Sequence, residues 1–175
     1  MQQKFRSASL WVLAVALSAS ALSAQTLKVA IVNAQKAVAD TQEIKKAQAD
    51  LATKYRPRQQ DVQKLQNDLQ QIQSQLRGPS VTPQTEQQLT VQGQEKQKQL
   101  QRLTEDLQAD FNQDRADILG RAGQRMQDVI KKLAEAKGLD VVIDISNTLY
   151  FKPALDMTAE ATAAYDKAYP SAPVK

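Results

Sequence analysis

Apolar residues recur at steps of three and four along two long stretches of the chain, residues 41–76 and 83–137. That spacing places them on one narrow stripe of an α-helix, and most other positions hold Gln, Lys, Arg, Asp or Glu. A helix with so thin an apolar stripe cannot lie in a globular core, so we predict that the two helices pack against each other as an antiparallel coiled-coil arm. The stripe residues are Ile44, Ala47, Leu51, Tyr55, Val62, Leu65, Leu69, Ile72 and Leu76 in the first helix, and Leu89, Leu100, Leu103, Leu107, Phe111, Ile118, Ala122, Met126, Val129 and Leu133 in the second.

A turn separates the two helices. A Gly-Pro pair at 78–79 ends the first, and Thr82 followed by Pro83 gives the second a capping hydroxyl and a proline at its first position. At 1.5 Å per residue the first helix spans about 54 Å and the second about 82 Å. The second helix therefore runs past the base of the arm and must pack there against another element. Gly120 and Gly123 fall near that base, either as points of close helix contact or as tolerated weak points, and we weigh these readings equally.

Pro57 interrupts the pattern of the first helix. It has no N–H to donate to the carbonyl of Thr53, and its ring crowds that carbonyl, which costs about 3 kcal/mol in a helix interior. The stripe also slips here, because Ala47, Leu51 and Tyr55 follow one another in two successive steps of four. We predict a continuous helix with an arm hinge at Pro57, so that the arm bends roughly halfway out. The alternative is a separate helix that starts at Pro57 after a short break.

Short strands flank the arm on both sides. Residues 27–33 are rich in β-branched side chains and apolar on both faces, which predicts a short buried strand. Residues 139–145 form the second predicted strand, with Asp140 and Asp144 on the face opposite its main apolar row. A third strand is expected at 148–151. These strands lie at the two ends of the arm sequence, so we expect them to meet at its base.

Two short helices are predicted beside the strands. Residues 34–39 make one helical turn or two, after which Asp40 caps the long helix and Glu43 reaches back to complete the capping arrangement. Residues 159–169 form a helix capped by Thr158. With the strands, these helices make a small hub.

The hub is too small to bury its own apolar side chains. A small piece of sheet is marginally stable without more strands or a packing partner. Oligomerisation would cover these faces, although physics alone does not set the copy number. The fold class is therefore α+β, with a signal segment at 1–24, a β hub at 25–40 and 138–175, and an arm at 41–137. The predicted oligomer interface consists of Val29, Ile31, Val141, Ile143 and Ile145.

Neither Cys nor His occurs in the 175 residues. Their absence from the sequence removes thiol chemistry, disulfides, the commonest zinc ligands and the usual general base near neutral pH. The five Gly residues are scattered, and none has the spacing of a phosphate-binding loop. We therefore expect no catalytic residue, no metal and no cofactor, and we do not expect an enzyme.

The first 24 residues have the layout of a secretory signal peptide. Lys4 and Arg6 precede an apolar run at 10–17, and small residues follow. A membrane anchor is disfavoured, because a spanning helix needs about 20 apolar residues. Cleavage follows Ala21 or Ala24, and the second leaves a compact start to the next strand. Loss of Lys4 and Arg6 lowers the formal charge from +4 to +2, so export argues against a nucleic-acid partner by compartment and by charge.

Three motifs stand in order along the chain, with the Gln-rich and Lys-rich hairpin between the first and the second. They are Val29-Ala30-Ile31-Val32-Asn33, Gly138-Leu139-Asp140-Val141-Val142-Ile143-Asp144 and Asp156-Met157-Thr158-Ala159-Glu160. Together they resemble the Skp/OmpH family of periplasmic chaperones, over essentially the whole mature chain. The sequence departs from that pattern in an outer arm that is nearly neutral where a basic tip is expected, and Pro57 is not carried over from the family.

The resemblance implies a homotrimer in which three chains form the β hub and three arms surround a cavity, like a jellyfish. Such proteins hold unfolded outer-membrane β-barrel proteins in the periplasm without ATP. Nucleic acid is not an expected partner, and peripheral contact with a membrane or lipid stays open. The alternative function is a structural coiled-coil spacer or tether of the cell envelope, which would bind one defined partner and have little affinity for unfolded chains.

Overall fold

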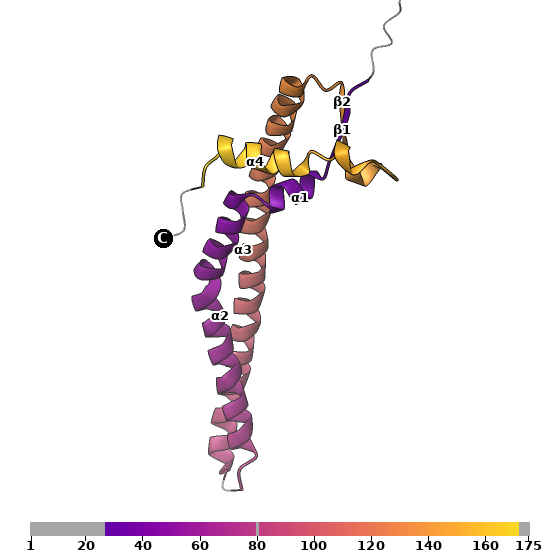
Figure 1. The fold of residues 1–175 in the computed structure, drawn as a ribbon. Helices are drawn as coiled ribbons and strands as arrows, with labels where there is room; N and C mark the ends of the chain where they lie inside the picture. The colour runs from indigo at the N-terminus through magenta and orange to yellow at the C-terminus, as the bar shows by residue number, and fades with distance from the viewer. Residues whose placement is uncertain (1–26, 80, 172–175) are drawn as a thin grey trace, which may run out of the picture.

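The computed structural model describes residues 27–79 and 81–171, and the predicted signal peptide lies outside them. The described chain is a long helical hairpin with a small hub at one end (Figure 1). This is the α+β arm and hub that the sequence predicts. The elements in chain order are β1 (Val29–Val32), α1 (Ala34–Ala39), α2 (Gln42–Leu76), α3 (Pro83–Lys137), β2 (Val141–Asp144) and α4 (Thr158–Ala168).

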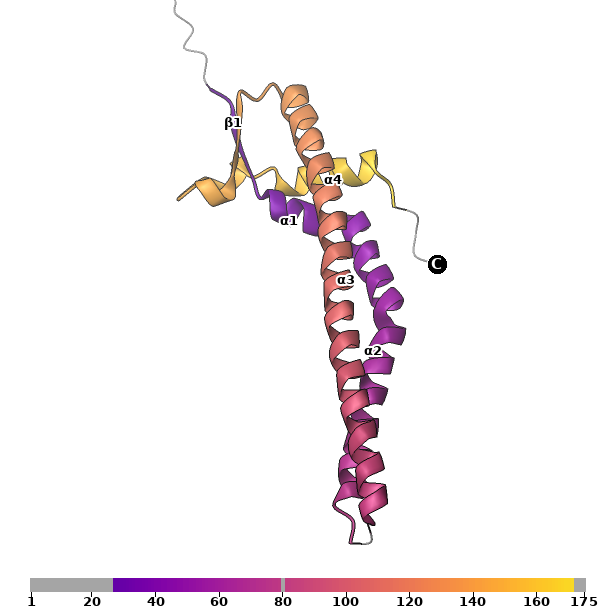
Figure 2. The ribbon, with the colours of Figure 1, turned by 180° about the vertical axis from the view of Figure 1, so that it is seen from behind.

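The arm consists of α2 and α3, which lie side by side as far as the tip in both views (Figures 1 and 2). Every residue of the predicted stripe is buried or half-buried, along the arm between the two helices and at its base in the hub core. The α2 helix continues through Pro57, and the alternative of a separate helix from Pro57 is wrong. Both views show α2 bowed along its length. A hinge function of Pro57 stays a prediction.

The hub contains a parallel pair of strands. Val29 of β1 lies opposite Val141 of β2, and Ile31 lies opposite Ile143. A parallel pair needs a long crossover connection, and here α1 and the whole arm provide it.

Two aspartates hold the ends of this strand pair. At one end the backbone N–H of Lys28 donates to Asp140 Oδ2 at 2.7 Å, and at the other the N–H of Ala34 donates to Asp144 Oδ2 at 3.2 Å. The pKa of the Asp144 carboxyl is lowered, mainly because the Ser146 hydroxyl donates to it. The charged residues between the apolar positions of the second strand motif therefore help to set its register.

The predicted third strand at 148–151 is wrong. The Asp144 carboxylate also accepts from the backbone N–H of Ser146 at 2.9 Å, and the chain turns away from the sheet in a 3-10 turn, Ile145–Asn147. A second such turn, Pro153–Leu155, brings Asp156 beside the free edge of β1, where it forms a single bridge with Ile31. A turn built on the Asp144 side chain thus replaces the expected strand.

The hub core forms where the end of α3 meets α1, α4 and one face of the strand pair. The last part of α3 packs here beyond the base of the arm, as its length predicts. A Cβ added at Gly120 or Gly123 would meet nothing within 4 Å, so neither glycine serves close helix contact within the described chain. The buried core residues are Ala30, Val32, Ala37, Val38, Ile44, Ala122, Met126, Val129, Met157, Ala161 and Tyr165.

The start of α2 differs from the prediction. Thr41 is its cap, since its side-chain oxygen accepts from the N–H of Ile44 at 3.3 Å. Asp40 instead ends α1 and pairs with Lys36 at 2.6 Å. Glu43 does not complete a capping arrangement, because residues from two other helices bind its carboxylate.

The start of α4 also differs. Thr158 is its first helical residue and not its cap, and its N–H and O–H both donate to Asp156 Oδ1, at 2.8 and 2.5 Å. The Thr158 oxygen accepts from the N–H of Asn33 at 2.9 Å. The Thr162 hydroxyl donates to the carbonyl of Ala37 at 3.1 Å. These bonds fix α4 across the end of β1 and α1.

Candidate functional site

Surfaces, and not a pocket, are the candidate functional features of this fold. Among residues 27–79 and 81–171 no group of three or more acidic, His or Cys side chains is placed to hold a metal ion. None of the helices described there combines the length and apolar character of a membrane span. The two features that remain are the outer face of the hub and the length of the arm.

The outer hub face carries the predicted interface residues. Ala30, Val32 and Val142 point toward the hub core, so their neighbours along each strand point away from it. The face thus brings together the residue pairs 29–141 and 31–143, and Ile145 follows in the next turn. Val141 is 40% exposed, whereas Ile31 is already buried within one chain, at 3% exposure. The use of this face between copies stays a prediction.

Sequence reasoning missed Leu149 and Tyr150 as candidate surface residues. It placed them in a strand, but Leu149 is fully exposed and Tyr150 is 81% exposed. Leu27 and Leu155 are further large apolar side chains exposed in the hub. The available signal was an apolar pair only two positions after the turn-forming residues 146–147. Exposed apolar side chains that adjoin one another are typical of interaction surfaces, so the neighbouring Leu149 and Tyr150 are candidates for one.

The root of the arm is tied to the hub by a charged cluster. Arg125 Nη1 of α3 donates to both carboxylate oxygens of Glu43 in α2 at 3.0 Å, and the hydroxyl of Tyr165 in α4 donates to Glu43 Oε2 at 2.7 Å. The Arg125 guanidinium also lies over the ring of Tyr169, 4.9 Å from its centroid. Burial, with the bond to Glu43, raises the pKa of Tyr165 to about 12. The Tyr165 hydroxyl thus stays protonated at neutral pH and donates to Glu43.

A second cluster joins α2 to α3 in the middle of the arm, beside Pro57. Lys54 Nζ donates to Asp114 Oδ2 at 2.5 Å, and the Tyr55 hydroxyl donates to the same oxygen at 2.7 Å. Arg58 Nη1 donates to Asp110 Oδ2 at 2.5 Å. The bonds from Lys54 and Tyr55 lower the pKa of the Asp114 carboxyl.

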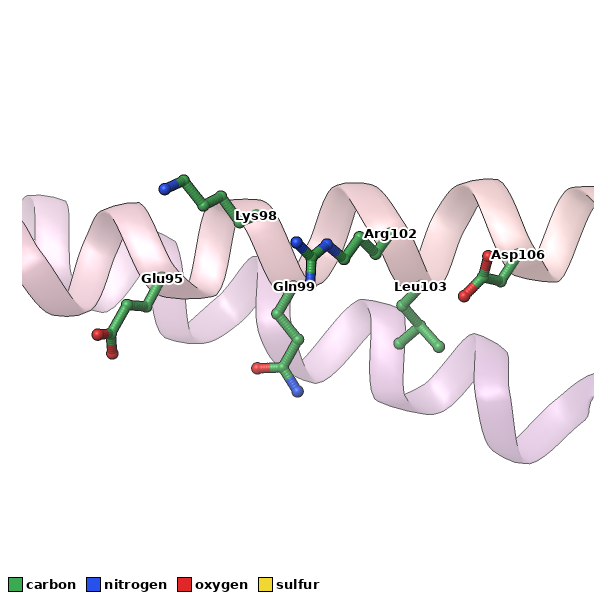
Figure 3. Close-up of a pocket in the computed structure, with 6 residues that line it drawn as sticks. All are labelled: Glu95, Lys98, Gln99, Arg102, Leu103 and Asp106. Carbon is green, nitrogen blue, oxygen red and sulfur yellow. The ribbon is translucent and has the colours of Figure 1, made fainter.

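The outer arm has a mixed, open surface. Lys96 Nζ of α3 donates to Asp68 Oδ2 of α2 at 2.7 Å. A hollow of about 400 Å³ lies on α3 nearby, where Lys98 points away from α2 and Leu103 points toward it (Figure 3). It is lined by Glu95, Lys98, Gln99, Arg102, Leu103 and Asp106. Side chains of both charges around one aliphatic group do not make a selective pocket, so contact on this surface would be spread out.

Comparison with known proteins places this architecture in a family. The family model described as Outer membrane protein (OmpH-like) matches residues 28–165. The Chaperone protein Skp of Yersinia enterocolitica is 30% identical over 152 residues, which cover 85% of this chain and 91% of that protein.

A solved structure shares the fold. A Caulobacter crescentus protein described as an outer membrane chaperone (OmpH-like) superposes with a TM-score of 0.70 at 20% identity, over 86% of this chain and 90% of that one. The family match spans β1, both arm helices, β2 and most of α4. The chain therefore belongs to the OmpH-like family of outer membrane proteins, whose members are chaperones and not enzymes.

Proposed function

We propose that the protein is an ATP-independent holding chaperone of the periplasm, which binds unfolded outer-membrane β-barrel proteins and prevents their aggregation. Its family and its Skp relative support the chaperone role. The periplasmic location rests on the family and on the signal peptide predicted at 1–24, and cleavage after Ala21 or Ala24 stays open.

One observation carries the proposal: the arm presents a long polar surface without a selective pocket. The apolar stripes of α2 and α3 are buried or half-buried against each other over about 54 Å of arm. A chaperone that holds many different sequences is served by weak contacts spread over a large area. Barrel strands alternate apolar and polar residues, so an unfolded barrel offers such contacts along its whole length.

We propose further that three chains assemble through the outer hub face. Val141 is exposed on this face of a single chain, and Leu149 and Tyr150 are exposed in the hub after β2, so that an assembly would cover apolar surface. Three arms on one hub would surround a cavity in which a client is held. In the proposed domain organisation, residues 25–40 and 138–175 form the hub and residues 41–137 form the arm. The last turns of α3 belong to the arm sequence but pack in the hub core. Peripheral contact with lipid stays open.

Light scattering of a urea-denatured outer-membrane barrel, diluted with and without the mature protein, tests the proposal. Protection at a stoichiometric amount of trimer, equal in the presence and absence of ATP, is the expected result. Absence of protection by the wild type would favour the tether function instead.

A shortened arm tests the cage. Lys96 binds Asp68 across the arm, so Leu65 and Leu100 lie at nearly the same level. A variant in which residues 65–100 are replaced by the native turn 77–82 should keep the hub and lose protection. If this variant protects the barrel as well as the wild type does, the arms do not form the holding surface.

A further inference from the structure

The middle of the arm has few apolar contacts. Tyr55 and Leu65 of α2 are buried, but Val62 is the one aliphatic side chain between them and is only half-buried. Pro57 lies in this stretch and leaves the carbonyl of Thr53 without its helical donor. Both the packing and the backbone of α2 are therefore weakest at the same place.

Side chains before and after the proline bind α3 at this weak point. Lys54 and Tyr55, which precede it, share Oδ2 of Asp114, and Arg58, which follows it, binds Asp110. These five side chains are called the latch below. The two carboxylates lie one helical turn apart on α3, so the latch spans the turn of α2 that the proline weakens.

The latch is more than an exposed ion pair. The Tyr55 ring is 2% exposed and packs edge-on against Phe111, with 5.5 Å between the ring centroids. Lys54 Nζ lies 5.3 Å from the centroid of the Tyr55 ring. Single surface ion pairs add little stability, but several bonds that meet at one buried aromatic ring hold a defined geometry.

We propose that the latch braces α2 across Pro57 and keeps the arm extended, and that Pro57 acts as a hinge only when the latch is open. While residues on both sides of the proline are bound to α3, the weakened turn cannot open. Without the latch, the outer arm swings as a unit about Pro57. This conformational role is independent of what the arm binds.

The outer arm supplies a matched control. The pair of Lys96 and Asp68 also joins α3 to α2, at 2.7 Å, but it lies between buried or half-buried stripe residues and eleven positions beyond the proline. Loss of this pair should not bend the arm, although it removes an ion pair of the same kind.

Two spin labels across the hinge measure the bend. The chain has no Cys, so Gln48→Cys at the root and Gln84→Cys near the tip give one labelled pair, about 50 Å apart by helix rise in the register that the pairs 58–110 and 68–96 set. Labelled chains are diluted with unlabelled ones, so that distances within one chain dominate. The latch is opened by Asp110→Asn with Asp114→Asn, and more gently by Tyr55→Phe, which keeps the aromatic packing. Far-UV circular dichroism checks that helix content is retained.

Opening the latch should shift the mean distance to shorter values and broaden its distribution. Asp68→Asn should leave both unchanged, and Pro57→Ala should cancel the effect of the latch variants. Unchanged distances in both latch variants would overturn the brace. Equal broadening with and without Pro57→Ala would overturn the hinge, and broadening by Asp68→Asn would show that any lost ion pair loosens the arm.

Discussion

The hydroxyl of Tyr165 donates to the carboxylate of Glu43 at 2.7 Å, although the two residues are 122 positions apart in the chain. One residue lies in the first turn of α2 and the other in α4, so this bond joins the root of the arm to the last helix of the hub. Arg125 of α3 shares the same carboxylate. Three helices thus meet at one side chain, and their meeting point sets the direction in which the arm leaves the hub.

Tyr165→Phe should destabilise the protein by about 1.5 to 3 kcal/mol, which is the usual contribution of a hydrogen bond to a charged group. The ring still fills its buried site, so the loss comes from the hydroxyl alone. Urea unfolding at one fixed protomer concentration measures the effect, because assembly would make stability depend on concentration. Ser74→Ala, which removes an exposed hydroxyl from the arm, is the control and should change the free energy of unfolding by less than about 0.5 kcal/mol. Equal free energies of unfolding in the two variants would mean that the bond to Glu43 is not structural.

Much of the arm can be predicted from the sequence because local signals and periodicity agree there. The α3 helix has the predicted bounds, since Thr82 caps its start and Gly138 closes its end with φ of 62°. The stripe predicts the buried side of each helix because a long helix leaves no other place for its apolar residues.

The hub is less predictable because distant residues compete for its side chains. Glu43 has the right spacing for a capping arrangement, but Arg125 and Tyr165 bind its carboxylate instead. Residues 148–151 have strand-like composition, but the turn at Asp144 takes them away from the sheet. The turn at Asp144 is closed by Ser146 only two positions away and was a local signal that the strand-like composition outweighed, whereas the partners of Glu43 are not visible in local sequence. The latch is hidden for the same reason, because periodicity predicts that α2 faces α3 without giving the register that places Lys54 beside Asp114.

Val141→Asp should dissociate the proposed trimer. It would place a carboxylate without a partner on a face that the assembly removes from water. Val91→Asp is a matched control, because Val91 is exposed to a similar degree, 49% against 40%, but lies near the tip of the arm. Sedimentation equilibrium should show a trimer for the wild type and the control, and smaller species for Val141→Asp. A monomeric wild type, or a trimer of Val141→Asp, would contradict the predicted interface.

Stability should fall in acid partly through Asp144. Its carboxyl has a pKa below the ordinary value of 3.8, because the Ser146 hydroxyl and then the N–H groups of Ser146 and Ala34 donate to it in the folded state. A lowered folded-state pKa means that this contribution is fully present above the unfolded-state value and is lost as the pH falls through the folded-state value.

Between about pH 5 and pH 2, the wild type should therefore lose more free energy of unfolding than Asp144→Asn does. Ser146→Ala removes only the hydroxyl donor and should give an intermediate slope. Urea unfolding across this range, at constant protomer concentration, is the measurement. If the wild type and Asp144→Asn have the same slope, the strand-end bonds do not contribute to acid sensitivity.

Gly120→Ala should stabilise the protein by about 1 kcal/mol, because glycine in a helix interior is less favourable than alanine by that amount. A Cβ at this position meets nothing within 4 Å in the single chain. Gly138→Ala is the opposite case and should destabilise by about 1 kcal/mol or more, since its φ of 62° is a left-handed conformation that alanine adopts poorly. Urea unfolding of both variants, followed by far-UV circular dichroism, should therefore give changes of opposite sign. If Gly120→Ala destabilises instead, the added methyl group must meet a neighbouring chain, and the glycine at the arm base serves close contact between subunits.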